Sequence, residues 1–191
     1  MYKCLAKNQF KDADGYELVP LREGDIESIR LWRNEQIEIL RQKVKITAEE
    51  QKRYFQEVIV PTFEVEKPPQ ILFSFLHNDR CIGYGGLTHL DWENARAEVS
   101  FIVATAHTAN DALYEKEFTH FLRLLFLVAF EVLSLHRLYT ETFAFRKSHM
   151  AILEKNGFKS EGTLREHVNK KGSWHDSILH GLLKGEWSHA G

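Results

Sequence analysis

The residue types that most often carry chemistry are scattered through this sequence and form no metal-binding or disulfide pattern. None of the ten histidines pairs with another at the spacing of the helical H-E-x-x-H motif. The two cysteines, Cys4 and Cys81, are too few for a disulfide framework and lack the spacing of a zinc site. We therefore expect no bound metal and a reducing, cytoplasmic location.

A cluster of glycines is the most conspicuous candidate for a ligand-binding segment. Gly83-Tyr84-Gly85-Gly86 places three glycines where the surrounding pattern predicts a strand. Glycine weakens a strand, and it often marks a bulge or a place where a ligand or a helix approaches the backbone. His89 and Trp92 follow closely, and an aromatic side chain there could stack on a planar ligand or pack in the interior.

Composition and charge limit the kinds of partner. A length of 191 residues fits one domain over residues 1–191, with residues 1–15 as a peripheral N-terminal extension. A hydrophobic content of 43% is that of a packed globular protein. The net charge of −2 gives no broad attraction for nucleic acid or an anionic membrane, so we expect neither as a partner. No apolar run reaches the length of about 18 residues that a membrane helix needs.

The first third of the chain predicts a strand and two helices. Alternating apolar and polar residues over 16–21 predict the strand, and Asp25 is in position to cap the first helix. The inward side chains of this helix are expected to be Ile26, Ile29, Leu31 and Trp32. Thr47 and Glu50 form a capping box that begins the second helix, which is expected to end before Pro61.

The remaining elements alternate between strands and helices. In order, the expected elements are a hairpin of 71–76 and 81–90 with its turn at 78–79, a strand at 96–103, a long helix at 113–133, a strand at 138–143, a helix at 148–155, and a strand pair around a turn at 170–172. This order mixes an antiparallel meander with one β-α-β crossover. The predicted fold class is α/β (α+β), with a mixed, mostly antiparallel central sheet flanked by about four helices.

A family resemblance is carried by segments in the C-terminal half. They are Ala129-Phe130-Glu131 with Leu135-His136-Arg137-Leu138, then Leu153-Glu154-Lys155-Asn156-Gly157-Phe158, Glu161-Gly162-Thr163-Leu164-Arg165-Glu166 and Gly185-Glu186-Trp187. In this order and spacing they resemble the GNAT acetyltransferase superfamily, most closely its branch of ribosomal-protein alanine and nucleotide-sugar N-acetyltransferases. The resemblance covers nearly the whole chain from Leu18, and it implies transfer of an acetyl group from acetyl-CoA to an amine.

The resemblance leaves the acceptor open. Trp32-Arg33-Asn34, followed by Arg41-Gln42, looks like the first segment of amino-sugar acetyltransferases, although ribosomal-protein acetyltransferases often show a similar pattern. A small amine, such as an amino sugar carried on a nucleotide, is the first hypothesis. A protein N-terminus, as on a ribosomal protein, is the second. A catalytically silent GNAT module that has lost acyl-CoA binding is the third, and a homodimer is compatible with each of them.

The resemblance also suggests catalytic residues. In the family, the strand before the long helix separates from its neighbour, which here leaves the backbone of Phe101, Ile102 and Val103 available to the acyl donor. Glu98 matches an acidic residue that similar enzymes often carry there, so it is the candidate base, with Glu141 as the alternative; either carboxylate could instead face solvent. His149 stands where the family often has serine, and it could protonate the leaving thiolate or simply cap a helix.

The segment that binds pyrophosphate in the family departs from its usual pattern. Residues 113–118, Leu-Tyr-Glu-Lys-Glu-Phe, contain no glycine and two carboxylates, whereas the family has R/Q-x-x-G-x-G/A there. Two alternatives follow. Either the longer preceding loop rebuilds a phosphate site, or the domain has lost the cofactor and keeps only the fold. The candidate donors for such a rebuilt site are Thr105, Thr108 and Asn110, assisted by Lys116. Arg146, which stands where the family usually has asparagine, could contact a cofactor phosphate or simply be solvated.

Candidates for the acceptor side come from two segments. Arg33, Asn34 and Gln42 could bind a phosphate or a sugar hydroxyl, although a solvated helix face would explain them nearly as well. By resemblance, Gly85, His89 and Trp92 are expected to wall the acceptor cleft.

Overall fold

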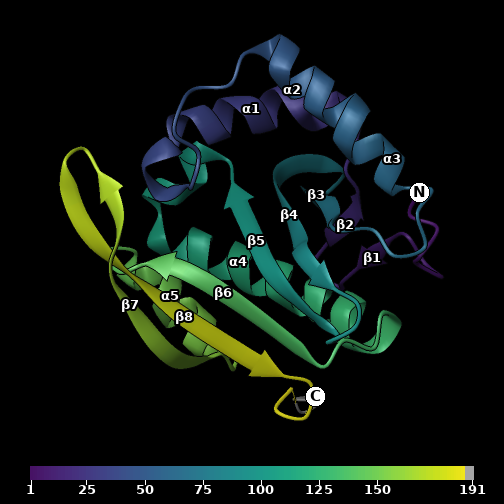
Figure 1. Ribbon diagram of the computed structural model, residues 1–191. Helices are drawn as coiled ribbons and strands as arrows, with labels where there is room; N and C mark the ends of the chain where they lie inside the picture. Colours follow the sequence, from purple (N-terminus) through teal and green to yellow (C-terminus); the bar gives the residue numbers. More distant parts are fainter. Residues whose placement is uncertain (188–191) are drawn as a thin grey trace.

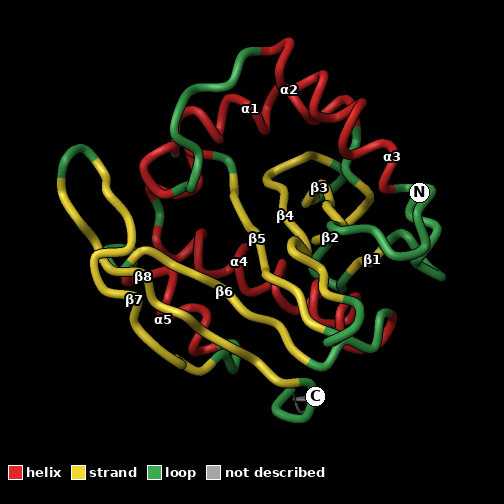
Figure 2. Tube along the Cα trace, in the orientation of Figure 1, coloured by secondary structure: helices red, strands yellow, loops and turns green. Residues whose placement is uncertain are grey.

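The computed structural model describes residues 1–187, which form one eight-stranded sheet in the order β1-β2-β3-β4-β5-β6-β8-β7 (Figures 1 and 2). Neighbouring strands are antiparallel except β5 and β6, which are parallel. The strands are β1 Phe10–Lys11, β2 Tyr16–Pro20, β3 Ile71–His77, β4 Arg80–Asp91, β5 Arg96–Val103, β6 Arg137–Phe143, β7 Lys159–Lys170 and β8 Ser173–Leu183. The predicted mixed, mostly antiparallel sheet is confirmed.

Helices cover both faces of the sheet (Figure 1). They are α1 Ile26–Glu35, α2 Ala48–Tyr54, α3 Val60–Thr62, α4 Asp111–Phe126 and α5 Lys147–Lys155. A π-helical stretch joins α2 to α3, and another extends α4 to Val132, so the described residues hold about four separate helical segments, as expected. No helix within residues 1–187 is long and apolar enough to cross a membrane.

Local sequence signals explain where several elements begin and turn. Asn78 and Asp79 both have positive φ, at 50° and 65°, which is the backbone of a tight two-residue hairpin turn between β3 and β4. Thr47 and Glu50 make the reciprocal hydrogen bonds of a capping box at the start of α2. These two predictions are confirmed because each depends only on residues close in sequence.

Four details of the N-terminal half differ from expectation. The Asp25 carboxylate does not cap α1, because it pairs with the Arg22 guanidinium at 2.6 Å. Leu31 is 44% exposed, because its side chain does not lie on the inward face of α1. Pro61 does not stop the second helix, because it lies in the first turn of α3, where a missing N–H costs nothing. Residues 1–15 are not peripheral, since the side chain of Tyr2 is buried in the main core.

The alternation of side chains along β5 divides the interior into two cores. Val99 packs with α4 in the larger core, whereas Ile102 packs with α1 and the stretch after α2 in the smaller one. Because successive strand residues point to opposite faces, Glu98 and Ser100 lie on the α1 and α2 face, and Phe101 lies on the α4 face. Residues near the middle of β5 can therefore reach ligands on either side of the sheet.

Candidate active site

The sheet is open between β5 and β6. Their ladder has three residue pairs, ending at Glu98 opposite Tyr139, although β5 continues to Val103 and β6 to Phe143. Figure 1 shows the two strands diverging beyond this point. Residues 99–103 therefore have no β6 partner, and a gap leads from one face of the sheet to the other.

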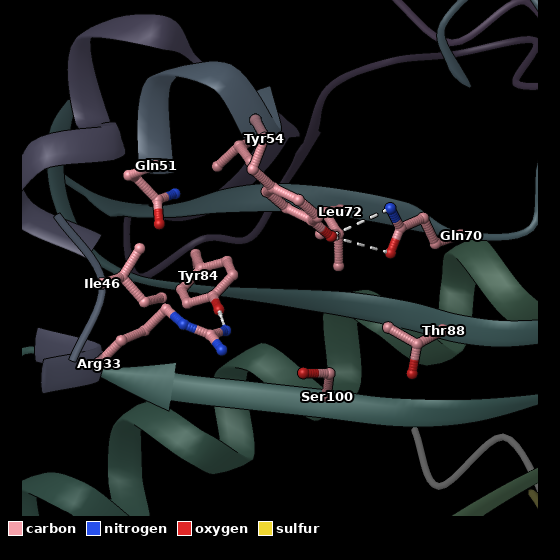
Figure 3. A pocket seen from close by; sticks show the side chains of 10 residues that line it. Arg33, Ile46, Gln51, Tyr54, Gln70, Leu72, Tyr84, Thr88 and Ser100 are labelled. Carbon is pink, nitrogen blue, oxygen red and sulfur yellow. Dashed lines mark hydrogen bonds between the residues drawn. The ribbon is translucent and has the colours of Figure 1, made fainter. Parts of the chain in front are cut away.

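Two adjoining cavities lie on the α1 and α2 side of the sheet, and the second of them reaches this gap. The first, of about 320 Å³, lies between the sheet and the helices α1 and α2 (Figure 3). The second, of about 200 Å³, is lined by residues of both diverging strands, including Phe101 and Thr142. Arg33, Thr88 and Ser100 line both cavities, so the two adjoin on the α1 and α2 face.

A third cavity continues the row on the other side of the gap. It measures about 200 Å³ and lies beside the first residues of α4 and α5. Ile39, Arg146 and His149 line both the second and the third cavity. The three cavities thus form a row that passes the gap between β5 and β6.

Two carboxylates share one arginine in the second cavity. The side chain of Glu98 is 9% exposed, and it accepts hydrogen bonds of 2.6 and 3.1 Å from the Arg41 guanidinium. Arg41 also lies 3.1 Å from the Glu141 carboxylate. The hydrogen bonds between Arg41 and Glu98 raise the pKa of Arg41. Neither carboxylate is simply solvated, because both line the cavity. The single cation keeps the two negative charges together at the gap.

His89 completes the surroundings of Glu98. Its Nδ1 lies 2.9 Å from the Glu98 carboxylate. The backbone of His89 has a φ of 48°, a left-handed conformation that few residues other than glycine adopt. This strain occurs at the irregular pairing between Thr88 and Asp91, which directs the imidazole toward Glu98.

The loop that carries Arg41 is fixed to α1 by Asn34. The Asn34 side chain accepts a hydrogen bond of 2.8 Å from the backbone N–H of Ile46 and donates one of 2.8 Å to its carbonyl. Its Oδ1 also accepts a bond of 3.0 Å from Gln42. Asn34 lines none of the three cavities, so it supports the loop, whereas Gln42 lines the second cavity.

The same loop is held from the other side by the β7-β8 hairpin. Lys170 Nζ donates hydrogen bonds of 2.5 and 3.2 Å to the carbonyl oxygens of Leu40 and Ile37. Lys171 pairs with Glu38 at 3.1 Å. These contacts place the tip of the hairpin beside the loop, as Figure 1 shows. Arg41 is therefore positioned by the contacts that its loop makes with α1 and with the β7-β8 hairpin.

A second polar group lies on the α4 face of the gap. The Tyr114 hydroxyl is 2.8 Å from His149 Nδ1, and it accepts a hydrogen bond of 3.3 Å from Arg146. Burial, with a smaller contribution from Arg146, lowers the pKa of His149 well below its usual value, so the imidazole is neutral at pH 7. Burial raises the pKa of Tyr114, so its hydroxyl keeps its proton.

Three rings stack beneath the gap. Phe118 is fully buried, with its ring centroid 4.6 Å from that of Phe101 and 4.5 Å from that of His149. Neither Phe118 nor Tyr114 lines the second cavity. The large side chains of residues 113–118, where the GNAT pattern has glycines, therefore leave the space between the diverging strands open.

Arg33 occupies the boundary between the first two cavities. Its Nε donates a hydrogen bond of 3.0 Å to Gln42, and its Nη1 donates to the hydroxyl of Tyr84 (Figure 3). The rest of the first cavity is largely apolar or aromatic, with Tyr54 and Leu72 among its walls. Burial raises the pKa of Tyr84, which therefore stays protonated.

Comparison with known proteins identifies this architecture. The family model described as an acetyltransferase (GNAT) domain matches residues 18–179. The chain belongs to the GNAT acetyltransferase family. As a GNAT protein it is an acyltransferase, and the family uses acetyl-CoA.

Two kinds of relative agree with this assignment. The chain is 27% identical over 135 residues to the "Putative ribosomal N-acetyltransferase YdaF" of Bacillus subtilis (strain 168), covering 70% of this chain and 71% of the relative. A spermidine N-acetyltransferase from Vibrio cholerae, solved with CoA and spermine, has a TM-score of 0.77 at 19% identity, covering 90% of this chain and 97% of the other. One of the "probable acetyltransferases (GNAT family)" from Chromobacterium violaceum ATCC 12472 has a TM-score of 0.74 at 18% identity, covering 95% and 94% of the two chains.

Two residues expected at the GNAT acceptor site serve packing instead. A Cβ on Gly85 would lie 2.1 Å from the Ser100 carbonyl oxygen and 2.8 Å from the Phe121 ring, so this glycine allows α4 and β5 to approach β4. The indole N–H of Trp92 donates a hydrogen bond of 2.8 Å to the Pro68 carbonyl, and the ring packs on the main core. Neither Gly85 nor Trp92 lines a cavity described here.

Two of the residues expected to hold the phosphates of acetyl-CoA have other contacts. Lys116 points toward β2, with its Nζ 5.8 Å from the centre of the Tyr16 ring. The Asn110 side chain caps α4 by accepting a hydrogen bond of 3.0 Å from the Leu113 N–H. Thr108 lines the third cavity, although its hydroxyl donates to the Thr105 carbonyl at 2.7 Å.

The residues expected along the path of the acyl donor are partly brought together. Phe101 lines the second cavity, and Arg146 lines the second and third. Ile102 points into the smaller core, and the Val103 carbonyl accepts a hydrogen bond of 2.8 Å from Gln36. A buried hydroxyl in the second cavity, that of Thr140, has no hydrogen-bond partner within residues 1–187. An orphaned hydroxyl there suits a polar ligand.

Sequence reasoning missed three contributors to this site. Arg41 belongs to a segment that resembles amino-sugar acetyltransferases, but no function of its own followed from the sequence. Its position between two carboxylates depends on a loop whose path no local signal predicts. Tyr114 lies in the glycine-free segment 113–118, and nothing in that segment indicated a proton donor. Lys147, which lines the third cavity, is the first residue of α5, and this position at a helix N-terminus was the available signal. Within residues 1–187, no group of three or more His, Cys, Asp or Glu side chains is arranged to hold a metal.

Proposed function

We propose that this protein is an N-acetyltransferase that transfers an acetyl group from acetyl-CoA to the primary amine of a small acceptor. One observation carries the proposal, namely the buried carboxylate of Glu98 at the point where β5 and β6 separate. A carboxylate in this position can take the proton that an amine must lose before it attacks a thioester. Acetyl-CoA supplies the activated acyl carbon when it is bound.

Glu98 is the proposed base, and its partners fix its position. Arg41 holds both carboxylate oxygens, and His89 lies on the exposed side, so the carboxylate has one orientation before any ligand arrives. Fixing the base in advance reduces the entropy lost on reaching the reactive arrangement. Because Arg41 also contacts Glu141, it limits the repulsion between the two carboxylates. Glu141 then acts as a structural partner of the base.

Tyr114, whose hydroxyl contacts Arg146 and His149 where the second and third cavities adjoin, is the proposed proton donor to the leaving thiolate, in place of His149. A neutral imidazole is too weak an acid to donate, and the lowered pKa of His149 keeps it neutral at pH 7. The Tyr114 hydroxyl keeps its proton and is oriented by the hydrogen bond from Arg146 and by His149 Nδ1. His149 therefore positions the donor.

The third cavity is the proposed site for the phosphate groups of acetyl-CoA. Asp111 lies in the first turn of α4 and lines this cavity. Its carboxylate makes that end of the cavity poorly suited to an anion. The start of α5 provides positive charge from Arg146 and Lys147, the Ser148 hydroxyl, and backbone N–H groups without helical partners. Binding at α5 would compensate for the missing glycines of α4.

The first cavity is the proposed acceptor site. It is enclosed by α1 and α2, and within the described chain no carboxylate lines it. A polyamine or a protein N-terminus with neighbouring cationic residues would favour acidic walls, so the lining supports a compact acceptor. This supports the small-molecule hypothesis over a ribosomal-protein acceptor.

Calorimetric titration with acetyl-CoA and desulfo-CoA tests the donor site first. We expect a dissociation constant in the micromolar range for acetyl-CoA. Release of free thiol in the presence of a panel of primary amines then tests turnover. Absence of heat at millimolar acetyl-CoA would refute the proposal and favour a module that has kept only the fold.

A further inference from the structure

Arg33 and Arg146 are the two arginines lining the described cavities that have no carboxylate partner within residues 1–187. No Asp or Glu within residues 1–187 forms an ion pair with the Arg33 guanidinium. Of the described arginines without an ion pair, Arg33 and Arg146 are partly buried, and the others are exposed. Arg146 lies on the proposed phosphate side. Arg33 lies on the acceptor side, where it lines the first and second cavities.

A partly buried cation without a counter-ion is costly, because it loses hydration and gains no ion pair. The contacts of Arg33 do not remove this cost, since Gln42 and Tyr84 are neutral acceptors. They do fix the guanidinium plane. Two of its five N–H groups are used in these contacts, so a planar fork of donors remains for a carboxylate or a phosphate.

The walls around Arg33 indicate the rest of the ligand. Tyr54, Leu72 and Leu21 present apolar or aromatic surface to the first cavity. The Tyr84 hydroxyl accepts from Arg33 and stays protonated, so it can donate to the same anionic group. Because the first cavity adjoins the second, an amine can reach Glu98 while the body of the ligand remains in the first cavity.

We infer that the acceptor is an amine that also carries an acidic group, a carboxylate or a phosphate, which pairs with Arg33, and an apolar or planar part that packs on the walls of the first cavity. This inference rests on the proposed function for the amine. The anion-binding character of the cavity stands on its lining alone.

Ligand-detected NMR titration of the full chain tests the anion site with three small probes. Benzoate and phenyl phosphate carry the two acidic groups on the same ring, and benzyl alcohol is the neutral comparison. We expect at least one anion to bind about tenfold more tightly than benzyl alcohol, because a charge-assisted pair contributes more than a neutral hydrogen bond. Preference for benzoate or phenyl phosphate distinguishes a carboxylate from a phosphate acceptor.

Arg33→Gln locates the binding. We expect the variant to lose the preference for the anions, and Arg53→Gln, which removes an exposed cation from α2, to keep it. Circular dichroism and urea unfolding of both variants show whether each is folded. Equal binding of benzoate, phenyl phosphate and benzyl alcohol to the wild type overturns the inference, even if Arg33→Gln fails to fold. Undiminished anion binding by Arg33→Gln also overturns it.

The proposed function and this inference fail separately. A wild type that binds acetyl-CoA and none of the anions refutes the acidic acceptor and leaves the acetyltransferase proposal intact. A wild type that binds an anion through Arg33 without binding acetyl-CoA refutes the proposed function and leaves the anion site.

Discussion

Replacing Glu98 with glutamine separates catalysis from stability. Glutamine has the same shape, and it keeps an oxygen that can accept a hydrogen bond from Arg41, but it cannot take a proton from an amine. Removing a general base typically lowers turnover by about 10²–10⁴-fold. We therefore expect kcat of Glu98→Gln to fall by at least about a hundredfold, with little change in the affinity for acetyl-CoA.

The structure limits how much of this loss could come from unfolding. Arg41 keeps its contact with Glu141 at 3.1 Å in the variant, so no cation is left without a partner. The loss of charge assistance in the hydrogen bonds from Arg41 then costs about 1.5–3 kcal/mol. A domain with a stability of about 5–15 kcal/mol remains almost wholly folded after such a loss. Urea unfolding monitored by circular dichroism measures this cost directly.

Glu141→Gln is the matched control. It removes the other carboxylate that contacts Arg41 in the same cavity. We expect kcat to fall less than about tenfold, in a thiol-release assay with saturating acetyl-CoA. If Glu141→Gln loses as much activity as we expect for Glu98→Gln, and Glu98→Gln is nearly unchanged, the base is Glu141. If both variants keep wild-type turnover, neither carboxylate is the base.

Three further predictions concern the α4 side of the gap. Lys147→Ala should raise the KM for acetyl-CoA by about three- to tenfold through loss of a phosphate contact, whereas Lys116→Ala, which removes a lysine facing β2, should leave KM unchanged; equal effects in steady-state kinetics would contradict the assignment. Tyr114→Phe should lower kcat by about a hundredfold while calorimetry finds acetyl-CoA affinity within threefold of wild type, and full turnover would remove Tyr114 as donor. The pKa of His149 in the folded protein lies well below 6.5. Below pH 6.5 the unfolded chain therefore takes up a proton that the folded chain does not, and the free energy of unfolding decreases as the pH is lowered. His149→Gln should remove up to about 1.4 kcal/mol per pH unit of this dependence in urea unfolding at pH 7.5, 6.5 and 5.5, and parallel curves for the two proteins would exclude the effect.

The fold could be predicted because its determinants are local. A capping box at Thr47, a two-residue turn at Asn78 and helical periodicity before Ala129 each need only neighbouring residues. Local reasoning was wrong where two local signals compete. Asp25 pairs with the Arg22 guanidinium three residues earlier and does not cap α1, and Pro61 lies in the first turn of α3, where proline is tolerated.

The candidate site was predictable in outline but not in its connections. Glu98 could be chosen through the family resemblance, yet its partner Arg41 comes from a loop 57 residues earlier. Lys116 was chosen for its charge, and its direction depends on which face of α4 meets β2. Glycines at 85 and 86 indicated a close approach, and sequence alone does not distinguish a ligand from the neighbouring strand and helix that make it here.

The hydrogen bonds from Lys170 to Leu40 and Ile37 join positions that are 130 and 133 residues apart. During synthesis, the loop with Arg41 leaves the ribosome long before the hairpin that restrains it. The proposed catalytic arrangement is therefore among the last parts of the molecule to assemble, and in an incomplete chain that ends before β7 the Arg41 loop keeps its contacts with Asn34 but lacks those with Lys170. Shortening the hairpin by a few residues would have the same effect on a finished protein.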